Sequence, residues 1–274
     1  MGVTIITGAG GGMGRACVER FRDDPLLLVD VDERALEGAC ARAPGATPVV
    51  ADLGTPAAIR ELVRQAEAAG GLTRLVHLAG VSPMMDDAPR VLQVDLVSTA
   101  LLLDWLRDCA GPGSVAICVA SIAAHLIPVS PAVQLVLDDP LVPDLLPRLE
   151  DALGAPLSAG TAYALAKHAV VRLCQRSAVA WGARGARVLS VSPGLIDTAM
   201  GQLELRDNPG KRGLIGRTPV AAPRDEGSPD LPGRTADIAD AIEFLAGPQA
   251  RFISGCDVRV DGGLVGALTG PPRA

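Results

Sequence analysis

The sequence predicts an α/β fold in which helices cover both faces of one parallel β-sheet. Short, strongly apolar segments alternate along the chain with longer segments of helical periodicity, which is the rhythm of a doubly wound sheet. The apolar segments are too uniformly hydrophobic for strands with one face in water, so both faces are expected to be buried. A length of 274 residues suits one large domain, and we expect a single domain over residues 1–274.

Seven strands and six main helices follow from this alternation. The predicted strands cover residues 3–6, 26–29, 47–50, 75–78, 115–119, 187–191 and 257–260. The predicted helices cover residues 13–22, 33–42, 55–69, 87–109, 161–182 and 235–246. Because crossovers between parallel strands are right-handed, few topologies remain open.

Two segments interrupt the alternation. Residues 125–160 contain several prolines between leucine-rich stretches, which predicts a helical insertion of two short helices joined by turns. Residues 199–233 are rich in glycine, proline and charged residues. We expect this second segment to form a lid over the substrate.

The composition argues against several classes of partner. A formal net charge of −6 lacks the positive surface that nucleic acids and anionic membranes require. No stretch approaches the ~20 apolar residues of a membrane span, and the N-terminus lacks the basic region of a signal peptide. We therefore expect a cytoplasmic protein that acts on a small molecule, with neither nucleic acid nor membrane as a partner.

Cysteine and histidine spacing gives no indication of a metal. The six cysteines are scattered without a C-x-x-C pair, and several lie in apolar runs where free thiols behave as small hydrophobic groups. The three histidines are not at metal-ligand spacing. We expect reduced cysteines and no metal site.

A glycine-rich loop follows the first predicted strand directly and leads into the first helix. It reads Thr7-Gly8-Ala9-Gly10-Gly11-Gly12-Met13-Gly14. At this position a tight turn brings backbone N–H groups and a helix N-terminus against a pyrophosphate. An ordinary tight turn is the alternative, because glycines serve that purpose as well. The position between strand and helix favours a bound dinucleotide and a Rossmann-type doubly wound parallel sheet.

Asp30 ends the second predicted strand, sixteen residues after Gly14. A carboxylate there accepts hydrogen bonds from the adenosine ribose hydroxyls and repels a 2′-phosphate. Neither Gly11 nor Val31 supplies the cation that a 2′-phosphate needs, so NAD is predicted in preference to NADP. The alternative, an aspartate that only caps the next helix, suits Asp32 better.

Tyr163 and Lys167 stand four residues apart, in a segment that is predicted to be helical. On a helix this spacing places them on one face, roughly 6 Å apart at the backbone. A nearby ammonium lowers the pKa of a phenol from ~10, which lets the phenol act as a general acid or base. Because the chain has one tyrosine, a chance pairing with a lysine is less plausible.

Together these motifs resemble the short-chain dehydrogenase/reductase family, and the resemblance runs from residue 3 to about residue 265. Seven motifs of that family occur in order: Thr7 to Gly14, Asp52-Leu53, Ala79-Gly80, Ser121, Tyr163 with Lys167, Pro193-Gly194 with Thr198, and Asp261-Gly262-Gly263. Seven ordered matches are far more specific than any one of them.

The resemblance implies hydride transfer between a nicotinamide and a carbinol carbon, as in alcohol dehydrogenases and ketone reductases of class EC 1.1.1. It makes Tyr163 the proton-exchanging group, with Ser121 on the substrate oxygen and Lys167 on the nicotinamide ribose. Cofactor contacts are implied for Gly8, Gly12, Met13, Gly14, Asp30, Asp52, Leu53, Ala79, Gly80, Tyr163, Lys167, Pro193, Gly194, Ile196 and Thr198. Without the resemblance, Ser121 could simply terminate a strand.

The chain departs from the family pattern at residue 95. The family usually has an asparagine there, which positions a water that relays protons through Lys167, whereas this chain has Asp95. Asp95 keeps an acceptor oxygen, loses the amide donor and adds a negative charge, and we count it with the catalytic residues. The alternative is an aspartate on the helix surface without a role.

All three histidines stand near these motifs. His77-Leu78 replaces two asparagines whose side chains usually connect neighbouring strands in the family, so we expect that connection to be lost. His125 lies four residues after Ser121, and His168 follows Lys167. An isolated histidine beside apolar residues is more often structural than catalytic, and we assign none of the three to chemistry. The alternative of a role at the site stays open for His125, because it lies close to Ser121.

The segment between Ser121 and Tyr163 is much longer than the family usually has. Its position resembles the 3α-hydroxysteroid dehydrogenase/carbonyl reductase branch, which suggests an alicyclic or hydroxysteroid alcohol as substrate. Helices inserted there would cover the helix pair that commonly joins subunits in this family. We therefore expect a homodimer, with a tetramer as the alternative.

Two other functions remain open from the sequence. A non-catalytic dinucleotide-binding sensor with the same fold is the main alternative because of Asp95, although the presence of Ser121, Tyr163 and Lys167 argues against it. A sugar-nucleotide epimerase fits poorly, because the glycine spacing differs and no separate substrate domain is visible. We favour NAD-linked oxidation of a hydrophobic secondary alcohol, or reduction of the ketone.

Overall fold

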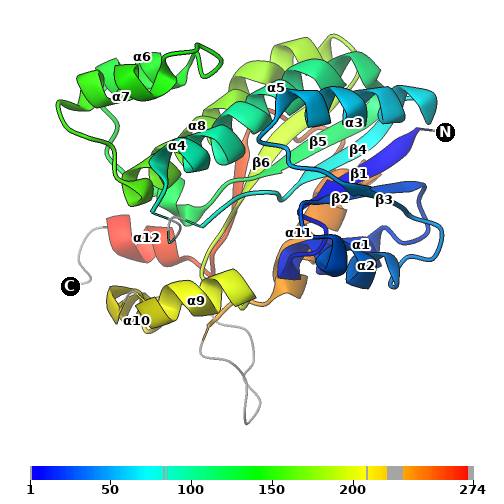
Figure 1. Cartoon of the computed structure of the whole chain (residues 1–274). Coiled ribbons are helices and arrows are strands. Elements are labelled where there is room, and N and C mark those ends of the chain that lie inside the picture. Colours follow the sequence, from blue (N-terminus) through cyan, green and yellow to red (C-terminus); the bar gives the residue numbers. More distant parts are fainter. Residues whose placement is uncertain (1, 83, 85, 208, 221–230, 271–274) are drawn as a thin grey trace.

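The computed structural model describes residues 2–270 apart from residues 83, 85, 208 and 221–230. Within these residues, seven strands form one parallel sheet in the order β3-β2-β1-β4-β5-β6-β7. The strands are β1 (Val3–Thr7), β2 (Leu26–Asp30), β3 (Thr47–Val50), β4 (Leu72–His77), β5 (Ala110–Val119), β6 (Arg187–Pro193) and β7 (Asp257–Val260). The order reverses between β1 and β4, so the predicted Rossmann-type doubly wound sheet is confirmed (Figure 1).

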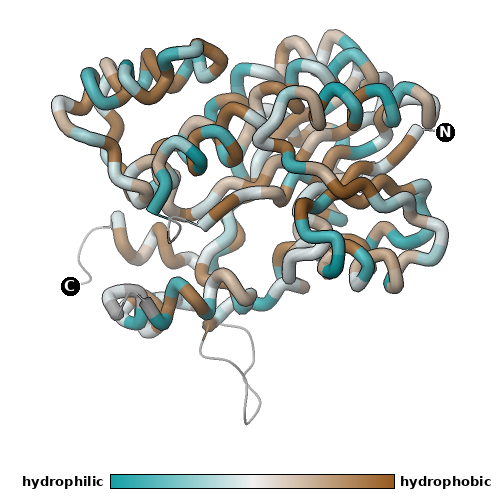
Figure 2. Tube along the Cα trace, viewed as in Figure 1, coloured by the Kyte–Doolittle hydropathy of each residue, from teal (hydrophilic) through white to brown (hydrophobic). Residues whose placement is uncertain are grey.

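Helices cover both faces of this sheet (Figure 1). The first face carries α3 (Pro56–Ala68), α5 (Ser98–Leu106) and α8 (Ala159–Gly182), and the second carries α1 (Gly12–Arg20), α2 (Glu33–Cys40) and α11 (Thr235–Ala246). Successive strand residues enter opposite hydrophobic clusters, as Ile5 and Ile6 do. Figure 2 shows hydrophobic residues gathered along the central strands. The strands are continuous apolar runs because both faces are covered.

Two strands are longer than predicted. β4 begins at Leu72 and β5 at Ala110, whereas their predicted starts are residues 75 and 115. The register between β4 and β5 shifts just after Leu72. The residues from Gly111 to Gly113 then interrupt the apolar run of β5. A hydrophobic pattern cannot reveal strand residues on the far side of such an irregularity.

The helix predicted over residues 87–109 is observed from Ala88 to Cys109, but the type of helical turn changes along it. It consists of α4 (Ala88–Val91), the π-helical segment η2 (Leu92–Val97), α5 and the 3-10 turn η3 (Arg107–Cys109). The Ser98 and Thr99 hydroxyls donate hydrogen bonds to the carbonyls of Val94 and Asp95. π-Helical segments are frequent at functional sites, and hydrophobic periodicity alone does not reveal them.

The segment between Ser121 and Tyr163 forms the 3-10 turn η4 (Ile122–His125) and the helices α6 (Pro131–Leu137) and α7 (Leu145–Leu153). A third hydrophobic cluster joins α6 and α7 to α4 and α8, and includes Val133, Leu137, Leu145, Leu149, Leu165 and Ala166. Asp138, at the end of α6, accepts two hydrogen bonds from Arg172 of α8, at 2.9 and 2.8 Å. The inserted helices therefore cover part of α8.

The remaining helices lie beyond the carboxyl ends of β6 and β7. They are α9 (Ala199–Asp207), α10 (Pro209–Ile215) and α12 (Leu264–Thr269), and the 3-10 turn η5 (Pro248–Ala250) follows α11. Of the segment 199–233, which is predicted to be a lid, residues 208 and 221–230 lie outside the described residues. In the part of the chain that the structure describes, no helix is long and apolar enough to cross a membrane.

Candidate active site

The glycine loop between β1 and α1 packs tightly against the strands around it. Gly8 has φ +65°, in the left-handed region that favours glycine. A Cβ on Gly14 would lie 2.1 Å from the Gly8 carbonyl oxygen, and a Cβ on Gly8 would lie 2.9 Å from Ala79 N. No side chain caps α1 at Gly11, so the N–H groups of its first turn are available to a phosphate. This cradle fits the pyrophosphate of a dinucleotide.

Asp30 ends β2 beside the glycine loop, in a cavity of ≈ 400 Å³. Its Oδ2 accepts a hydrogen bond from Gly10 N at 2.8 Å, and its Oδ1 accepts one from Asp32 N at 3.1 Å. Asp32 caps α2 by accepting a hydrogen bond from Ala35 N at 3.0 Å. The helix-capping role therefore belongs to Asp32, and the Asp30 carboxylate is held in a fixed orientation. Gly8, Gly12, Met13, Gly14, Asp52, Leu53, Ala79 and Gly80 line the same cavity.

Arg90 of α4 also lines this cavity, and sequence analysis did not identify it. Its Nη2 donates a hydrogen bond to Asp52 Oδ1 at 2.8 Å, and Gly54 N donates to the same oxygen at 2.9 Å. The Arg90 hydrogen bond is the main reason that the pKa of Asp52 lies below its usual range. Arg90 belongs to no recognisable motif, so nothing in the sequence marked it.

A second cavity, of ≈ 380 Å³, is continuous with the first. The two share the lining residues Met13, Leu78, Gly80, Val81, Thr198 and Met200. The second cavity is also lined by Asp95, Ser121, Tyr163, Lys167, Pro193, Gly194 and Ile196. All the site residues that the sequence predicts therefore line one of two connected cavities.

The Pro-Gly and Asp-Gly-Gly motifs meet at the end of β6. A Cβ on Gly194 would lie 2.7 Å from Asp261 Cα, so only glycine allows this approach. The Asp261 carboxylate accepts hydrogen bonds from Gly263 N and Val265 N at 2.9 and 2.8 Å. Thr198 Oγ1 accepts a hydrogen bond from Gly201 N at 3.0 Å. These local contacts fix the segment that follows Pro193 along the cavity.

Tyr163 and Lys167 lie one turn apart on α8, and both line the second cavity. Lys167 Nζ lies 5.6 Å from the centroid of the Tyr163 ring and donates a hydrogen bond to Val119 O at 3.3 Å. Burial raises the pKa of the Tyr163 phenol. The Lys167 ammonium and a hydrogen bond with Ser121 oppose that rise, but burial outweighs them. The fold thus brings the three predicted catalytic groups together.

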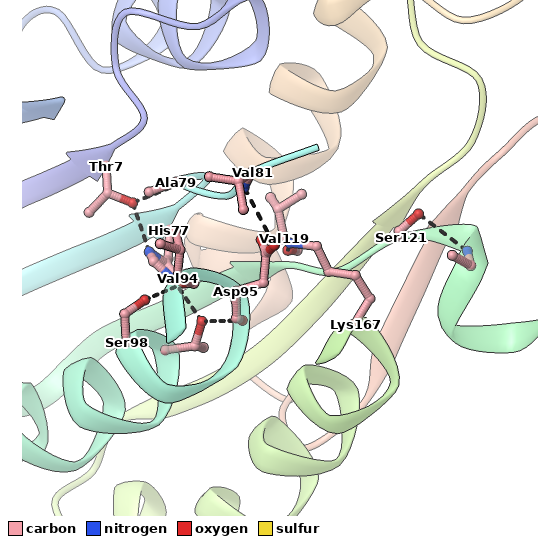
Figure 3. A network of polar contacts seen from close by, with 12 residues as sticks. Thr7, His77, Ala79, Val81, Val94, Asp95, Ser98, Val119, Ser121 and Lys167 are labelled. Carbon is pink, nitrogen blue, oxygen red and sulfur yellow. Dashed lines mark hydrogen bonds and ion pairs between the residues drawn. The ribbon is translucent and has the colours of Figure 1, made fainter. Parts of the chain in front are cut away.

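Asp95 lies in η2 beside Lys167 and is 1% exposed (Figure 3). Its Oδ1 lies 3.0 Å from Lys167 Nζ, and its Oδ2 accepts a long hydrogen bond from Val81 N at 3.4 Å. A Cβ on Gly80 would lie 2.4 Å from Asp95 Oδ1. Burial lowers the pKa of Lys167, but the Asp95 carboxylate and the Tyr163 phenol outweigh it and hold that pKa above its usual value. The alternative of Asp95 as a helix-surface residue is wrong, because the carboxylate is buried in an ion pair.

His77 connects β4 to β1 and to α5 (Figure 3). Its Nδ1 lies 2.7 Å from Thr7 Oγ1, and its Nε2 lies 2.9 Å from Thr99 Oγ1. Thr7 Oγ1 also accepts a hydrogen bond from Ala79 N, and Thr99 Oγ1 donates one to the Asp95 carbonyl at 2.9 Å. Burial, aided by Lys167, lowers the pKa of His77 to about 3, so the ring is neutral. The prediction that the connection between neighbouring strands is lost at this position is therefore wrong, because the His77 side chain makes such a connection.

Glu204 is a further residue of the second cavity that the sequence did not indicate. Glu204 of α9 lines this cavity and accepts a hydrogen bond from the Ser82 hydroxyl at 3.1 Å. The wall beyond Tyr163 is otherwise largely aliphatic and includes Ile122, Leu126, Leu195, Leu205, Leu214 and Leu231. Glu204 lies in an irregular part of the sequence without a motif, so no signal could have found it. Among the described residues, no group of three or more His, Cys, Asp or Glu side chains could hold a metal ion.

Comparison with known proteins indicates the class of enzyme to which this site belongs. The family model described as "NAD dependent epimerase/dehydratase family" matches residues 4–191, and the one described as "Enoyl-(Acyl carrier protein) reductase" matches residues 153–265. The first description names NAD dependence, and the second names a reductase. With the glycine cradle and the Tyr163–Lys167 pair, the matches define an oxidoreductase with a nicotinamide dinucleotide cofactor.

Relatives that align over nearly the whole chain identify the family. Meso-2,3-butanediol dehydrogenase from Serratia marcescens is 30% identical, over 99% of this chain and 97% of that protein. 3-alpha-hydroxysteroid dehydrogenase/carbonyl reductase from Comamonas testosteroni is 25% identical, over 96% of each chain. The structure of 3-alpha-hydroxysteroid dehydrogenase from Pseudomonas sp. B-0831 complexed with NADH is 28% identical, with a TM-score of 0.76, over 99% of this chain and 100% of that chain. The chain belongs to the short-chain dehydrogenase/reductase family.

Proposed function

We propose that the protein is an NAD-dependent dehydrogenase of secondary alcohols, or a reductase of the corresponding ketones, located in the cytoplasm. The observation that carries this proposal is the gathering of Ser121, Tyr163 and Lys167 in a cavity continuous with the dinucleotide cleft. Bound NAD would accept a hydride from the carbinol carbon, and NADH would return it. The residues of the chain hold the substrate oxygen and move its proton.

The catalytic roles follow from the contacts of each group. The Tyr163 phenol exchanges the proton of the substrate oxygen, while the Ser121 hydroxyl donates a hydrogen bond to that oxygen. The Lys167 ammonium lowers the cost of forming a phenolate at Tyr163, and it would hold the nicotinamide ribose of the bound cofactor. Asp95 keeps Lys167 charged and in place through the buried ion pair.

The cofactor roles divide along the two cavities. In the cavity that Asp30 lines, Gly8, Gly12, Met13 and Gly14 would hold the pyrophosphate, Asp30 the adenosine ribose, Asp52 and Leu53 the adenine, and Ala79 and Gly80 the middle of the cofactor. In the second cavity, Pro193, Gly194, Ile196 and Thr198 would hold the nicotinamide. NAD is favoured over NADP because a 2′-phosphate would meet the fixed Asp30 carboxylate. Arg90 does not offset this repulsion, since its guanidinium is engaged by Asp52.

The substrate is proposed to be hydrophobic, in keeping with the aliphatic wall of the second cavity. An alicyclic or hydroxysteroid alcohol suits that wall, and two of the relatives carry a hydroxysteroid dehydrogenase activity in their names. The Glu204 carboxylate, which accepts a hydrogen bond from the Ser82 hydroxyl, adds a polar acceptor to this wall. A second hydroxyl or an amine on the substrate would therefore bind more tightly than a purely apolar analogue.

An oxidation assay tests the proposal. NADH formation is followed at saturating NAD over a panel of hydroxysteroids and cyclic secondary alcohols, with the corresponding ketones assayed in reverse with NADH. Turnover of at least one compound is expected. NAD binding without turnover of any compound would support the alternative of a non-catalytic sensor.

We also propose a homodimer, because α6 and α7 cover a face of α8 that subunits would otherwise share. Light scattering of the purified protein should give a mass near twice 28.0 kDa. A mass near four times that value would mean that the inserted helices do not mask this face.

A further inference from the structure

The position of Ser121 depends on the short turn that follows it. η4 contains four residues, and 3-10 turns of this length make few internal hydrogen bonds. Ala124 N donates a hydrogen bond to Ser121 O at 3.0 Å, and Ala123 N donates one to Ser121 Oγ at 3.2 Å. Both contacts join Ser121 to the turn itself. On its other side Ser121 is held by the end of β5, where Ala120 N donates a hydrogen bond to Val191 O at 2.8 Å. The orientation of Ser121 therefore depends on this strand end and on what anchors η4.

η4 has two polar anchors: His168 Nδ1 lies 3.3 Å from the Ala124 carbonyl oxygen, and His125, the last residue of η4, contacts the neighbouring strands. Its Nε2 lies 2.9 Å from Asp257 Oδ2 on β7 and 3.1 Å from Ser192 Oγ on β6. Because an ionised carboxylate only accepts hydrogen bonds, Nε2 must carry the proton and donate it. Asp257 Oδ1 accepts hydrogen bonds from Ser190 Oγ at 2.6 Å and from Ser192 Oγ at 3.1 Å. The Asp257 side chain is 7% exposed, so three donors stabilise a nearly buried charge.

The His125 anchor reaches the segment that lines the nicotinamide end of the cleft. Ser192 is followed directly by Pro193 and Gly194, which line the second cavity with Ser121. One network thus fixes the turn that carries Ser121 relative to the strand end beside it. A nonpolar residue at 125 would fill the space, but it would not set the orientation of the turn as hydrogen bonds do.

We infer that His125 and Asp257 are positioning residues for catalysis, which hold η4 so that the Ser121 hydroxyl meets both the Tyr163 phenol and the substrate oxygen. The substrate part of this inference rests on the proposed function. The contact between Ser121 and Tyr163 does not rest on the proposed function, because both residues belong to the protein. The first test therefore needs no substrate.

The single tyrosine of the chain makes that test direct. Absorbance at 295 nm during an alkaline titration reports ionisation of Tyr163, with the Tyr163→Phe protein as the blank. The Ser121 hydrogen bond lowers the pKa of Tyr163, so Ser121→Ala should raise the measured pKa. His125→Ala should raise it in the same direction, and His125→Gln, which keeps a donor, should restore it in part. In the Ser121→Ala background, His125→Ala should have no further effect.

Kinetics with a turned-over alcohol provide the second readout. His125→Ala and Asp257→Asn should lower kcat by about tenfold to a hundredfold while the dissociation constant for NAD stays unchanged, because misplacing a catalytic group affects the chemical step. Ser254→Ala is the matched control, since Ser254 bonds to Val188 of β6 away from η4 and should change neither readout.

Two results would overturn the inference. One is an unchanged tyrosine pKa and kcat in His125→Ala, and the other is an additive effect of His125→Ala in the Ser121→Ala background. If His125→Ala does not fold, the milder His125→Gln and Asp257→Asn proteins decide the question by the same two readouts. Coupling in the titration without turnover of any alcohol would refute the proposed function and leave the positioning of Ser121 intact.

Discussion

The dinucleotide cleft and the catalytic cavity adjoin each other but are built in different ways. Around Asp30 the cleft is held by backbone N–H groups of neighbouring loops, those of Gly10 and Asp32. The catalytic cavity instead depends on buried side chains from separate elements, with Lys167 and Asp95 at 6% and 1% exposure. Changes in the cleft should therefore alter which cofactor binds. Changes in the catalytic cavity should alter proton transfer or stability, according to which buried side chain is replaced.

The largest expected effect comes from Tyr163→Phe, which removes the proton-exchanging group and leaves the cleft intact. Turnover should fall by about 10²–10⁴-fold, the usual contribution of general acid–base catalysis. NAD should still bind, because the glycine loop and Asp30 are unchanged. Initial rates of NADH formation and a NAD titration measure the two quantities. Near-normal activity in this protein would refute the role of Tyr163.

Asp95→Asn should separate stability from activity within the catalytic cavity. Lys167 would stay buried without its counter-ion, so the free energy of unfolding should fall by about 3 kcal/mol. The pKa of Lys167, which Asp95 raises, should fall as well. Activity should be unchanged or higher, since asparagine is the usual residue of the family at this position.

Chemical denaturation and kcat on the same Asp95→Asn preparation measure both effects. Because the pKa of Lys167 is raised on folding, the stabilisation from this ion pair is lost as the pH rises beyond about 10.5. Burial raises the pKa of the Asp95 carboxyl, so the stabilisation is also lost as the pH falls through that raised pKa. The stability difference between the two proteins should shrink accordingly at higher pH. A hundredfold loss of kcat would show that the carboxylate itself is required.

Asp30→Ala should change cofactor choice and leave the catalytic cavity unaffected. Removing the carboxylate should relax the ratio of kcat/KM for NAD and NADP by about tenfold, because one unfavourable charge interaction with the 2′-phosphate is lost. Asp32→Ala is the matched control, since Asp32 caps α2 and should not affect this ratio. Equal use of both cofactors by the unmodified enzyme would contradict the argument from Asp30.

Glu204→Gln should have the smallest effect, confined to the substrate end of the catalytic cavity. For alcohols that carry a second hydroxyl or an amine, KM should rise by a few-fold to about tenfold, the range of one hydrogen bond. For alcohols without such a group, KM should stay the same. Steady-state kinetics on matched pairs of substrates measure this difference, and an equal rise for both members of a pair would exclude recognition by Glu204.

The same contrast explains which parts of the site could be predicted. Gly8, Gly14 and Asp30 stand at a strand–turn–helix junction, so their sequence positions alone indicate their place in the fold. Tyr163 and Lys167 share a helix face by their spacing. By contrast, the helix predicted over residues 87–109 contains a π-helical segment, Leu92–Val97, that no periodic pattern reveals.

The sequence by itself determined the doubly wound sheet, the glycine loop and the helix face that carries Tyr163 and Lys167. Each depends on the order and spacing of neighbouring residues, which local backbone geometry converts into structure. Tertiary structure alone decided the partners of the buried polar groups: Asp95 with Lys167, His77 with Thr7 and Thr99, and His125 with Asp257. These partners are distant along the chain. They are chosen by packing, because a buried charge or ring nitrogen is stable only where the fold brings a matching group within reach.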